Sequence, residues 1–341
     1  MSDVLRVWEA ARDLAKAGTV GALATVARRR GSLPMAQDAK MVVTADGRRW
    51  GTVGGGCTEA DVTEQALTVA RSGAPAFVRH TLNADLAGDV GLSCGGTVDF
   101  FVEPLVASDE MAALYELVAR AIARREKAVV VTGIDWSAGP RKLAAVGSEL
   151  VTVGEGLSAE HADAAASRQA FVDEERGTFV EPVERSPRVI IFGAGYVGAE
   201  IAKLAAGVGF HVVVIDDRAE FANRDRVPWA HEVVVEDFRS FLERLTLDEA
   251  DYVLATTRGH SFDAQIVEKT AGSRARYVGM LGSRRKRAVV FRALEDAGVP
   301  PTALGRVHVP IGEAIGADTP AEIAVSVVAE LIKVRRLGER G

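Results

Sequence analysis

The chain has 341 residues, of which 48% are hydrophobic and 26% charged, and its formal net charge is −6 at neutral pH. This length is sufficient for two domains of ordinary size, and the composition is typical of a soluble globular protein. The charge excludes a global basic field that would attract nucleic acid, and no apolar stretch approaches the length of a membrane span. We therefore expect neither nucleic acid nor a membrane as a partner.

The first eighteen residues alternate charged and apolar side chains at helical spacing and lack the apolar core of a secretory signal. We therefore expect a cytoplasmic protein. Its two cysteines, Cys57 and Cys94, cannot form a disulfide framework, and the cytosol would keep them reduced. No clustered Cys/His spacing predicts a structural zinc site.

The first half of the chain is predicted to mix helices and strands. A tight hairpin is predicted at Asp46 and Gly47, and a helix stop at Gly73. Helices are predicted at 3–18, 58–73 and 108–126, with a further alanine-rich helix before 177, and strands at 19–30, 40–56, 77–82, 95–105, 128–134, 142–148 and 177–187.

Two of these strands contain the same four-residue sequence, Phe-Val-Glu-Pro, at 101–104 and again at 179–182. This short repeat suggests two similar layers, 1–105 and 106–185, inside one domain. Charge and Pro187 then interrupt the pattern, which places a domain boundary between 185 and 186.

The second half alternates apolar strands with helices, beginning with a strand, a glycine loop, a helix and a second strand over 188–217. Such alternation predicts a parallel, doubly wound sheet. A final helix is predicted from Thr319, which caps it together with Pro320 and Glu322. The predicted fold class is thus α/β: an N-terminal mixed α+β domain, 1–185, followed by a Rossmann-like domain, 186–341.

The glycine loop of the second domain has the spacing of a nucleotide-binding turn. Gly193 permits the tight turn, Gly195 lets backbone amides approach a phosphate, and Gly198 lets the helix pack on the strand. Asp216 ends the next strand, where a carboxylate can hold ribose hydroxyls. Two interpretations stay open here, a bound nucleotide-type ligand or a retained scaffold without one.

Other loops should converge on the same crevice, because ligands bind beyond the carboxyl ends of parallel strands. Arg258, His260 and Asp263 follow one such strand, and His260 is well placed to meet a ligand. Gly282, Ser283 and Lys286 follow another, where a helix start and cations suit an anion. For residues 285–287 a solvated helix face is the favoured interpretation.

In the first domain, Gly54, Gly55 and Gly56 precede Cys57 at a predicted helix start. The helix N-terminus favours a thiolate, and the glycines leave room for a bulky ligand, so a functional Cys57 is favoured over a buried one. A thiolate there can attack an electrophile, carry a persulfide sulfur or ligate a metal. Glu59 is predicted to cap the first turn. For Cys94, between glycines of its own, function and burial stay equally open.

These motifs, in this order and spacing, resemble the XdhC/CoxI family of accessory factors for xanthine dehydrogenase and aerobic carbon monoxide dehydrogenase. The resemblance implies a homodimer that binds molybdenum cofactor, protects it while a cysteine desulfurase supplies its terminal sulfur, and passes it to the apo-enzyme. The residues that match the family are Gly54, Gly55, Gly56, Cys57, Glu59, Cys94 and Gly95 in the first domain, and Gly193, Gly195, Gly198, Asp216, Arg218, Arg258, His260, Asp263, Gly282, Ser283 and Lys286 in the second.

The chain departs from the family pattern at three positions. Met35 stands where the family usually carries arginine, and Asp38 where it carries glycine. Losing a cation and adding a carboxylate should weaken anion binding at that loop. Tyr196 stands in the glycine loop where histidine is often found.

The leading functional prediction is a carrier and not a turnover enzyme. The Gly193 or the Gly282 loop would hold the anionic end of molybdopterin or its dinucleotide form, and Cys57 would contact molybdenum, with Cys94 and His260 as further candidates for sulfur or proton chemistry. The alternative is an NAD(P)-dependent oxidoreductase with Asp216 on the ribose and His260 as proton donor. A third is a docking protein whose nucleotide site is vestigial. The carrier hypothesis requires Cys57 and the Gly193 loop to face the same cavity.

Overall fold

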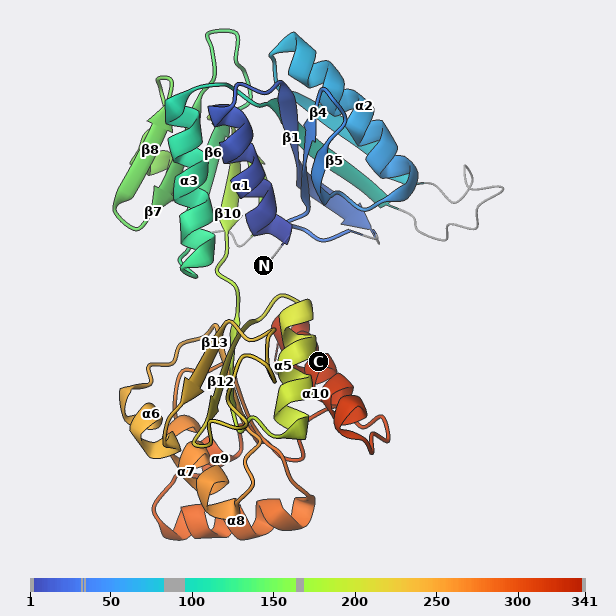
Figure 1. The fold of residues 1–341 in the computed structure, drawn as a ribbon. Helices are drawn as coiled ribbons and strands as arrows, with labels where there is room; N and C mark the ends of the chain where they lie inside the picture. The colour runs from blue at the N-terminus through green and yellow to red at the C-terminus, as the bar shows by residue number, and fades with distance from the viewer. Residues whose placement is uncertain (1–2, 32, 34, 83–95, 164–168, 339–341) are drawn as a thin grey trace. The chain divides into compact units, whose positions relative to one another are not determined.

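The computed structural model describes residues 3–31, 33, 35–82, 96–163 and 169–338. The chain divides into two compact units, Met1–Arg185 and Ser186–Gly341 (Figure 1). No helix among the described residues has both the length and the apolar character needed to span a bilayer.

The N-terminal unit contains two five-stranded antiparallel sheets, with strand orders β3-β2-β1-β5-β4 and β8-β7-β6-β10-β9. The elements are α1 (Asp3–Lys16), β1 (Gly21–Gly31), β2 (Lys40–Thr44), β3 (Arg49–Thr52), α2 (Gly56–Ser72), β4 (Ala76–Leu82) and β5 (Gly96–Pro104), then α3 (Asp109–Ala123), β6 (Ala128–Gly133), β7 (Lys142–Val146), β8 (Glu149–Val153), α4 (Ala159–Asp163), β9 (Phe171–Asp173) and β10 (Thr178–Val183).

The two sheets are built the same way. Each begins with a helix, continues through three strands and a second helix, and ends with two strands, and the orders of the two sheets correspond strand for strand. The repeated Phe-Val-Glu-Pro lies on the equivalent strands β5 and β10. Strands β8 and β9 have no counterpart among the sequence predictions, because β9 has only three residues and β8 is largely exposed.

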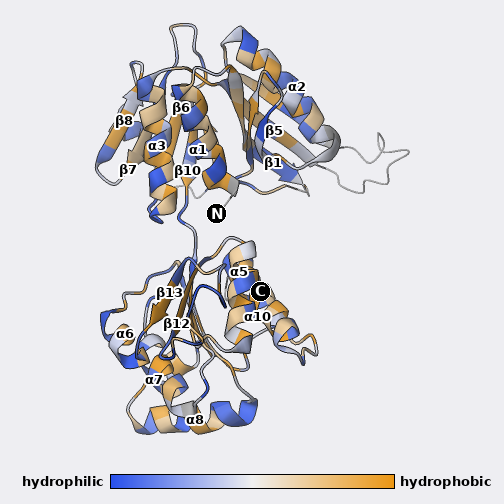
Figure 2. Cartoon of the chain, in the orientation of Figure 1, coloured by the Kyte–Doolittle hydropathy of each residue, from blue (hydrophilic) through white to orange (hydrophobic). Residues whose placement is uncertain are grey.

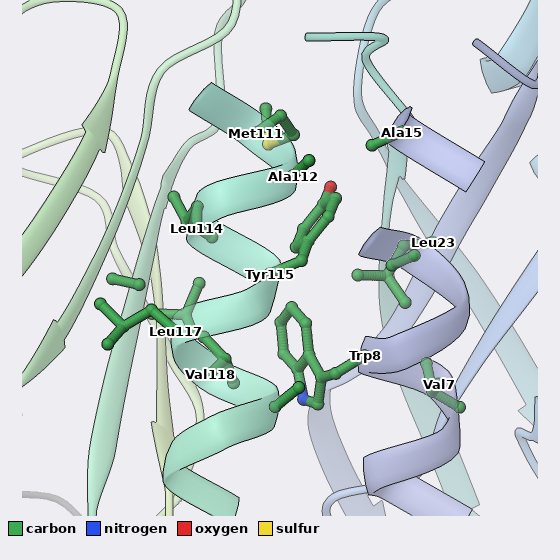
Figure 3. Close-up of a cluster of buried hydrophobic side chains, with 14 of the residues drawn as sticks. Val7, Trp8, Ala15, Leu23, Met111, Ala112, Leu114, Tyr115, Leu117 and Val118 are labelled. Atoms are coloured by element: carbon green, nitrogen blue, oxygen red, sulfur yellow. The ribbon is translucent and has the colours of Figure 1, made fainter. Parts of the chain in front are cut away.

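Helices α1 and α3 pack against each other between the two sheets, and their contact forms the main core of this unit (Figure 3). Trp8 and Tyr115 face each other across it with ring centroids 5.8 Å apart. Helix α2 covers the opposite face of the first sheet, where Val62, Ala66 and Val69 are buried. Those three residues are spaced as the sequence pattern predicts for one helix face.

The C-terminal unit contains a parallel, doubly wound sheet, as predicted. The sheet has six strands in the order β13-β12-β11-β14-β15-β16. Its elements are β11 (Arg188–Phe192), α5 (Tyr196–Gly207), β12 (His211–Asp216), β13 (Glu232–Val235), α6 (Phe238–Arg244), β14 (Asp251–Ala255), α7 (His260–Thr270), β15 (Tyr277–Met280), α8 (Arg284–Asp296), α9 (Pro301–Leu304), β16 (Val307–His308) and α10 (Pro320–Leu337).

Helices α5 and α10 cover one face of this sheet, and α6 to α9 cover the other (Figure 1). Strands β12 and β13 are coloured hydrophobic, whereas helix α8 carries many hydrophilic residues (Figure 2). A strand covered on both faces reads as a continuous apolar run, which is why the sequence pattern here is clear. Helix α10 begins with the predicted capping box of Thr319 and Glu322, behind which Pro320 fills the first position.

Candidate functional site

A cavity of the C-terminal unit lies beyond the carboxyl ends of the central strands β11 and β14. Strand order reverses between these two strands, and such switch points hold the ligands of doubly wound folds. The cavity has a volume of about 320 Å³. It is lined by Gly193, Gly195, Tyr196, Val197, Asp216, Arg218, Phe238, Thr256, Thr257, Arg258, Leu281 and Pro320.

The glycine loop has the geometry that its sequence predicts. Gly193 has φ of +107°, and a Cβ there would meet the Thr256 carbonyl oxygen at 2.5 Å. A Cβ on Gly198 would meet the Gly193 carbonyl oxygen at 2.0 Å, so helix α5 packs directly against the loop. Gly195 differs, because a Cβ there would have no neighbour within 4 Å. Two glycines are thus required by packing, and the third keeps space open in front of the loop.

Helix α5 presents its N-terminus to this space. Gly195 is its N-cap and offers no side chain to bond the first-turn amides. Those amides have no carbonyl partner within a helix, and the helix dipole adds a partial positive charge. A phosphate is the ligand that such an end binds most readily.

Asp216 is completely buried and already bonded within the protein. Its Oδ2 accepts hydrogen bonds from the Ala194 amide at 2.8 Å and from Arg218 Nη2 at 3.0 Å. Its Oδ1 accepts from the amide of Arg218 at 3.1 Å and from Arg218 Nε at 2.8 Å. The carboxylate therefore fixes the glycine loop and orients Arg218, and a ribose would compete with these bonds.

A second ion pair joins the ends of β12 and β14. Arg258 donates to both carboxylate oxygens of Asp217, at 2.8 and 2.9 Å, and its guanidinium lowers the pKa of Asp217. Arg218 stacks on Phe221, with its guanidinium carbon 3.8 Å from the ring centroid. The cavity rim thus holds two cations in defined positions, each with a carboxylate neighbour.

Asp263 and Lys286 form a buried ion pair that supports the cavity without lining it. Asp263 Oδ1 accepts hydrogen bonds from the Thr257 hydroxyl at 2.7 Å and its amide at 3.3 Å. Lys286 Nζ also donates to the Leu281 carbonyl at 2.8 Å. Because Thr257 and Leu281 both line the cavity, this pair holds the loops after β14 and β15 together.

The Gly282 loop accordingly differs from its prediction at one residue. Arg285 and Arg287 are exposed, as the solvated-face interpretation states, but Lys286 turns inward to Asp263. The interpretation was wrong for Lys286 because a helix places neighbouring side chains on different faces. Ser283 caps helix α8 by accepting from the Lys286 amide at 3.2 Å. Gly282 and Ser283 are not among the residues that line the cavity.

The glycines before Cys57 all adopt the left-handed backbone region, with φ of +123°, +74° and +61° at Gly54, Gly55 and Gly56. Only glycine adopts three such angles in succession without strain. A Cβ on Gly54 would meet the Met35 side chain at 3.1 Å, whereas none at Gly55 or Gly56 would have a neighbour within 4 Å. Met35 thus packs on this loop as an apolar contact.

Glu59 does not act as the predicted cap. Its carboxylate accepts a hydrogen bond from the Thr52 hydroxyl at 2.5 Å and lies 3.5 Å from Arg49 Nη1. It therefore ties helix α2 back to strand β3. The N-cap of α2 is Gly55, which has no side chain to accept a bond.

Cys57 and His260 occupy the second position of α2 and the first position of α7. Their side chains, and all of Cys94 and Gly95, lie outside the described part of the chain. The roles predicted for these side chains, and the hollow expected to join Cys57 to the Gly193 loop, therefore stay predictions. The described side chains include no group of three or more His, Cys, Asp or Glu residues arranged to hold a metal ion.

The structure brings Gly193, Gly195, Asp216, Arg218 and Arg258 together at one cavity. Sequence reasoning did not single out four of its lining residues, Val197, Phe238, Leu281 and Pro320. Pro320 was identified only as part of a helix cap. All four lie at or beside the start of a helix or the end of a strand on the cavity side, so topology was the signal that could have found them.

Fold and site together define a protein with a nucleotide-type crevice in a Rossmann unit, preceded by a duplicated antiparallel unit. The family model described as "XdhC and CoxI family" matches residues 14–81 of the chain. A second family model, described as "XdhC Rossmann domain", matches residues 189–331. The chain belongs to the XdhC and CoxI family.

Two curated proteins and one crystal structure are similar over nearly the whole chain. A protein of Bacillus subtilis (strain 168), described as a probable xanthine dehydrogenase subunit, is 27% identical, covering 92% of this chain and 93% of that protein. The uncharacterized protein YqeB of Escherichia coli (strain K12) is also 27% identical over 92% of the chain, which spans only 43% of that protein. A crystal structure described as a xanthine dehydrogenase from Bacillus halodurans superposes with a TM-score of 0.79 at 27% identity, covering 100% of this chain and 97% of that one.

Proposed function

We propose that this protein binds molybdenum cofactor, holds it while its terminal sulfur is installed, and delivers it to an apo-molybdoenzyme of the xanthine dehydrogenase type. Family membership and the similarity to a probable xanthine dehydrogenase subunit support a maturation role. The observation that carries the proposal is the open space in front of Gly195, at the N-terminus of α5, within a cavity of about 320 Å³.

The anionic end of the cofactor is the part that these residues fit. Molybdopterin carries a phosphate, alone or within a pyrophosphate, and the first-turn amides of α5 are suited to such a group. Arg218 and Arg258 stand at the rim, each fixed by a carboxylate, so that little further ordering is needed when an anion binds. Arginine is also the side chain that matches phosphate oxygens in a planar fork.

The proposal assigns the metal end to Cys57. Three glycines with left-handed backbone angles place Cys57 at the start of a 17-residue helix, and the backbone of Gly55 and Gly56 faces open space. A thiolate at a helix N-terminus is a ligand for soft or high-valent metal centres. Cys94 and His260 are proposed as further contacts for sulfur transfer or proton transfer.

A carrier is favoured over an NAD(P)-dependent oxidoreductase by the bonding of Asp216. A dehydrogenase of this fold uses the acid at this position to accept the ribose hydroxyls. Here both oxygens of Asp216 accept bonds from Arg218, and one also holds the Ala194 amide. We include in the proposal a cysteine desulfurase as the sulfur source, a homodimeric state and a cytoplasmic location.

The proposal is tested by purifying the chain anaerobically from a host that makes molybdenum cofactor. Molybdenum is measured by mass spectrometry and pterin by fluorescence after oxidation, each per chain, for wild type, Cys57→Ala and Gly195→Val. Gly207→Val is the matched control, because Gly207 ends the same helix α5, is exposed, and has no atom within 4 Å of a Cβ.

Wild type and Gly207→Val are expected to carry pterin and molybdenum. Gly195→Val should lose both, because its side chain fills the space that a phosphate needs, and Cys57→Ala should carry less molybdenum. If all four proteins purify empty, the carrier function is wrong. Saturable calorimetric binding of NAD or NADP by an empty wild-type protein would instead support the oxidoreductase.

A further inference from the structure

The ring of Tyr196 is left open at the Rossmann crevice. Tyr196 is the first residue of α5, lines the cavity of about 320 Å³ and is 74% exposed. Its neighbour Gly195 leaves free space in front of the loop. Ligand pockets are lined mainly by apolar and aromatic side chains, and an aromatic ring binds a second ring through a large, flat contact. An open ring beside a phosphate-type loop therefore favours a ligand that carries a ring as well as a phosphate.

Two aromatic rings and two guanidinium groups alternate beside the cavity. The guanidinium carbon of Arg226 lies 5.7 Å from the ring centroid of Tyr196 and 5.0 Å from that of Phe221. The guanidinium carbon of Arg218 lies 3.8 Å from the Phe221 centroid. Contacts of this kind are attractive within about 6 Å, so the four groups support one another. The two ends of the row, Tyr196 and Arg218, both line the cavity.

Arg226 is placed by the rings and not by a carboxylate. Arg218 and Arg258 are each bonded to a carboxylate, whereas the guanidinium of Arg226 forms no ion pair within the described part of the chain. Its Nε is buried and has no acceptor among the described residues. Its backbone is anchored, because the Arg226 amide donates to Asn223 Oδ1 at 3.1 Å and the next residue, Val227, is completely buried. The guanidinium is therefore available to hold the Tyr196 ring.

We propose that Tyr196 is the ring-binding residue of this crevice. A planar heteroaromatic ring of the ligand stacks on the open face of Tyr196, while the phosphate of the same ligand lies at the N-terminus of α5. Arg226 is a positioning residue, which holds the Tyr196 ring from the side away from the ligand. This role rests on the proposed function, because it requires a phosphate ligand in this crevice. The ligand class is a phosphorylated heteroaromatic compound, a chemistry that a nucleotide and a phosphorylated pterin share.

The test is calorimetric titration of the full chain, purified from a host that makes no molybdenum cofactor. The probes are GMP, the phosphate ester of hydroxymethylpterin, and ribose phosphate, which has no heteroaromatic ring. The variants are Tyr196→Leu, Tyr196→Phe and Arg226→Met, with Trp229→Leu as the matched control. Trp229 is an aromatic residue of the same unit, is 43% exposed, and is not among the residues that line the cavity. Because Tyr196 is exposed, its replacement is not expected to impair folding.

Wild type is expected to bind GMP or the pterin ester about tenfold more tightly than ribose phosphate, because stacking on an aromatic side chain contributes that much or more. Tyr196→Leu should lose this preference and bind ribose phosphate as wild type does. Tyr196→Phe, which keeps a ring, and Trp229→Leu should both resemble wild type. The ring-bearing probe that binds more tightly identifies the source of the ring as a nucleobase or a pterin.

Arg226→Met should reduce the preference for the ring-bearing probe about threefold, and should not change it in the Tyr196→Leu background, because Arg226 acts through the ring. An equal reduction in both backgrounds would overturn the positioning role. No binding of either ring-bearing probe by wild type, or an unchanged preference in Tyr196→Leu, would overturn the role of Tyr196.

Failure of ring binding and failure of the carrier function give different results. The carrier function fails when wild type from a cofactor-producing host purifies empty. Retention of pterin by Tyr196→Leu at the wild-type level, from that same host, would overturn ring binding by Tyr196 and leave the carrier function standing.

Discussion

His231 shows how one side chain is fixed by a backbone contact that depends on its protonation. Its Nδ1 accepts a hydrogen bond from the Val212 amide at 3.0 Å, which requires the neutral ring. His211 stacks on it with ring centroids 4.5 Å apart. Desolvation, followed by the charge of His211, lowers the pKa of His231 to about 4. The folded C-terminal unit therefore excludes a proton that the unfolded chain binds.

We predict that acid destabilises the C-terminal unit through this residue. The unfolded His231 takes up a proton below its ordinary pKa of 6.5, so its contribution is complete above that pH and is lost as pH falls to about 4. Because His231 is exposed, the loss should be only on the order of 1 kcal/mol. Urea unfolding, followed by Trp229 fluorescence from pH 7 to 4.5, should show a shallower decline for His231→Asn. Equal slopes in the two proteins would contradict the prediction.

Strands β2 and β7 join the two sheets of the N-terminal unit through exchanged ion pairs. Lys40, which begins β2, pairs with Glu181 of the second sheet, and Lys142, which begins β7, pairs with Glu103 of the first. Both lysines are 1% exposed. The Trp8 ring centroid lies 4.5 Å from Lys40 Nζ and 5.9 Å from Lys142 Nζ. The two ion pairs are thus equivalent. Each joins the lysine at the start of β2 or β7 to the glutamate of the repeated Phe-Val-Glu-Pro sequence on the last strand of the other sheet.

Removing one lysine should be more harmful than removing a whole pair. Lys40→Met leaves the Glu181 carboxylate buried without its cation, which costs about 3–5 kcal/mol, whereas Lys40→Met with Glu181→Leu should recover much of this loss. Lys127→Met is the control, because Lys127 pairs with Glu184 at the surface and should matter by less than about 1 kcal/mol. Urea unfolding in a Trp229→Phe background reports the N-terminal unit, which holds the other three tryptophans. If the double variant is no more stable than Lys40→Met, this prediction is wrong.

At the scale of the whole molecule, the buried apolar clusters divide along the same line as the two units. Four clusters lie entirely within 1–185 and two within 186–341. Inside the first unit the situation is different. The cluster around Trp8 and Tyr115 draws on helices and strands from both sheets, so neither sheet has a complete core of its own.

We predict that residues 1–185 and 186–341 each fold when expressed separately, because each keeps its own core. Fragments 1–105 and 106–185 should each fail to fold alone, because separating them exposes both sides of the α1–α3 contact. Circular dichroism and urea unfolding of the four fragments provide the measurement. Cooperative unfolding of 1–105 by itself, or none for 1–185, would contradict the prediction.

The sequence by itself determined the elements whose pattern depends on local geometry. The parallel strands of the second unit are apolar runs because both faces are covered, and the cap at Thr319 is read from residue type and spacing. The turn at Gly193 and Gly195, and the close packing of Gly198 in the first turn of α5, were predicted correctly for the same reason. Short or exposed strands such as β8 and β9 leave too weak a pattern to be found in this way.

Only the tertiary structure decided which side chains meet. The sequence indicated acids and bases near the crevice, but it could not show that Asp216 is bonded to Arg218 or that Lys286 turns inward to Asp263. Nor could it show that Lys40 reaches Glu181 in the other sheet. Such contacts join residues far apart in the chain, or depend on a local turn, and their partners are set by packing and desolvation in the folded protein.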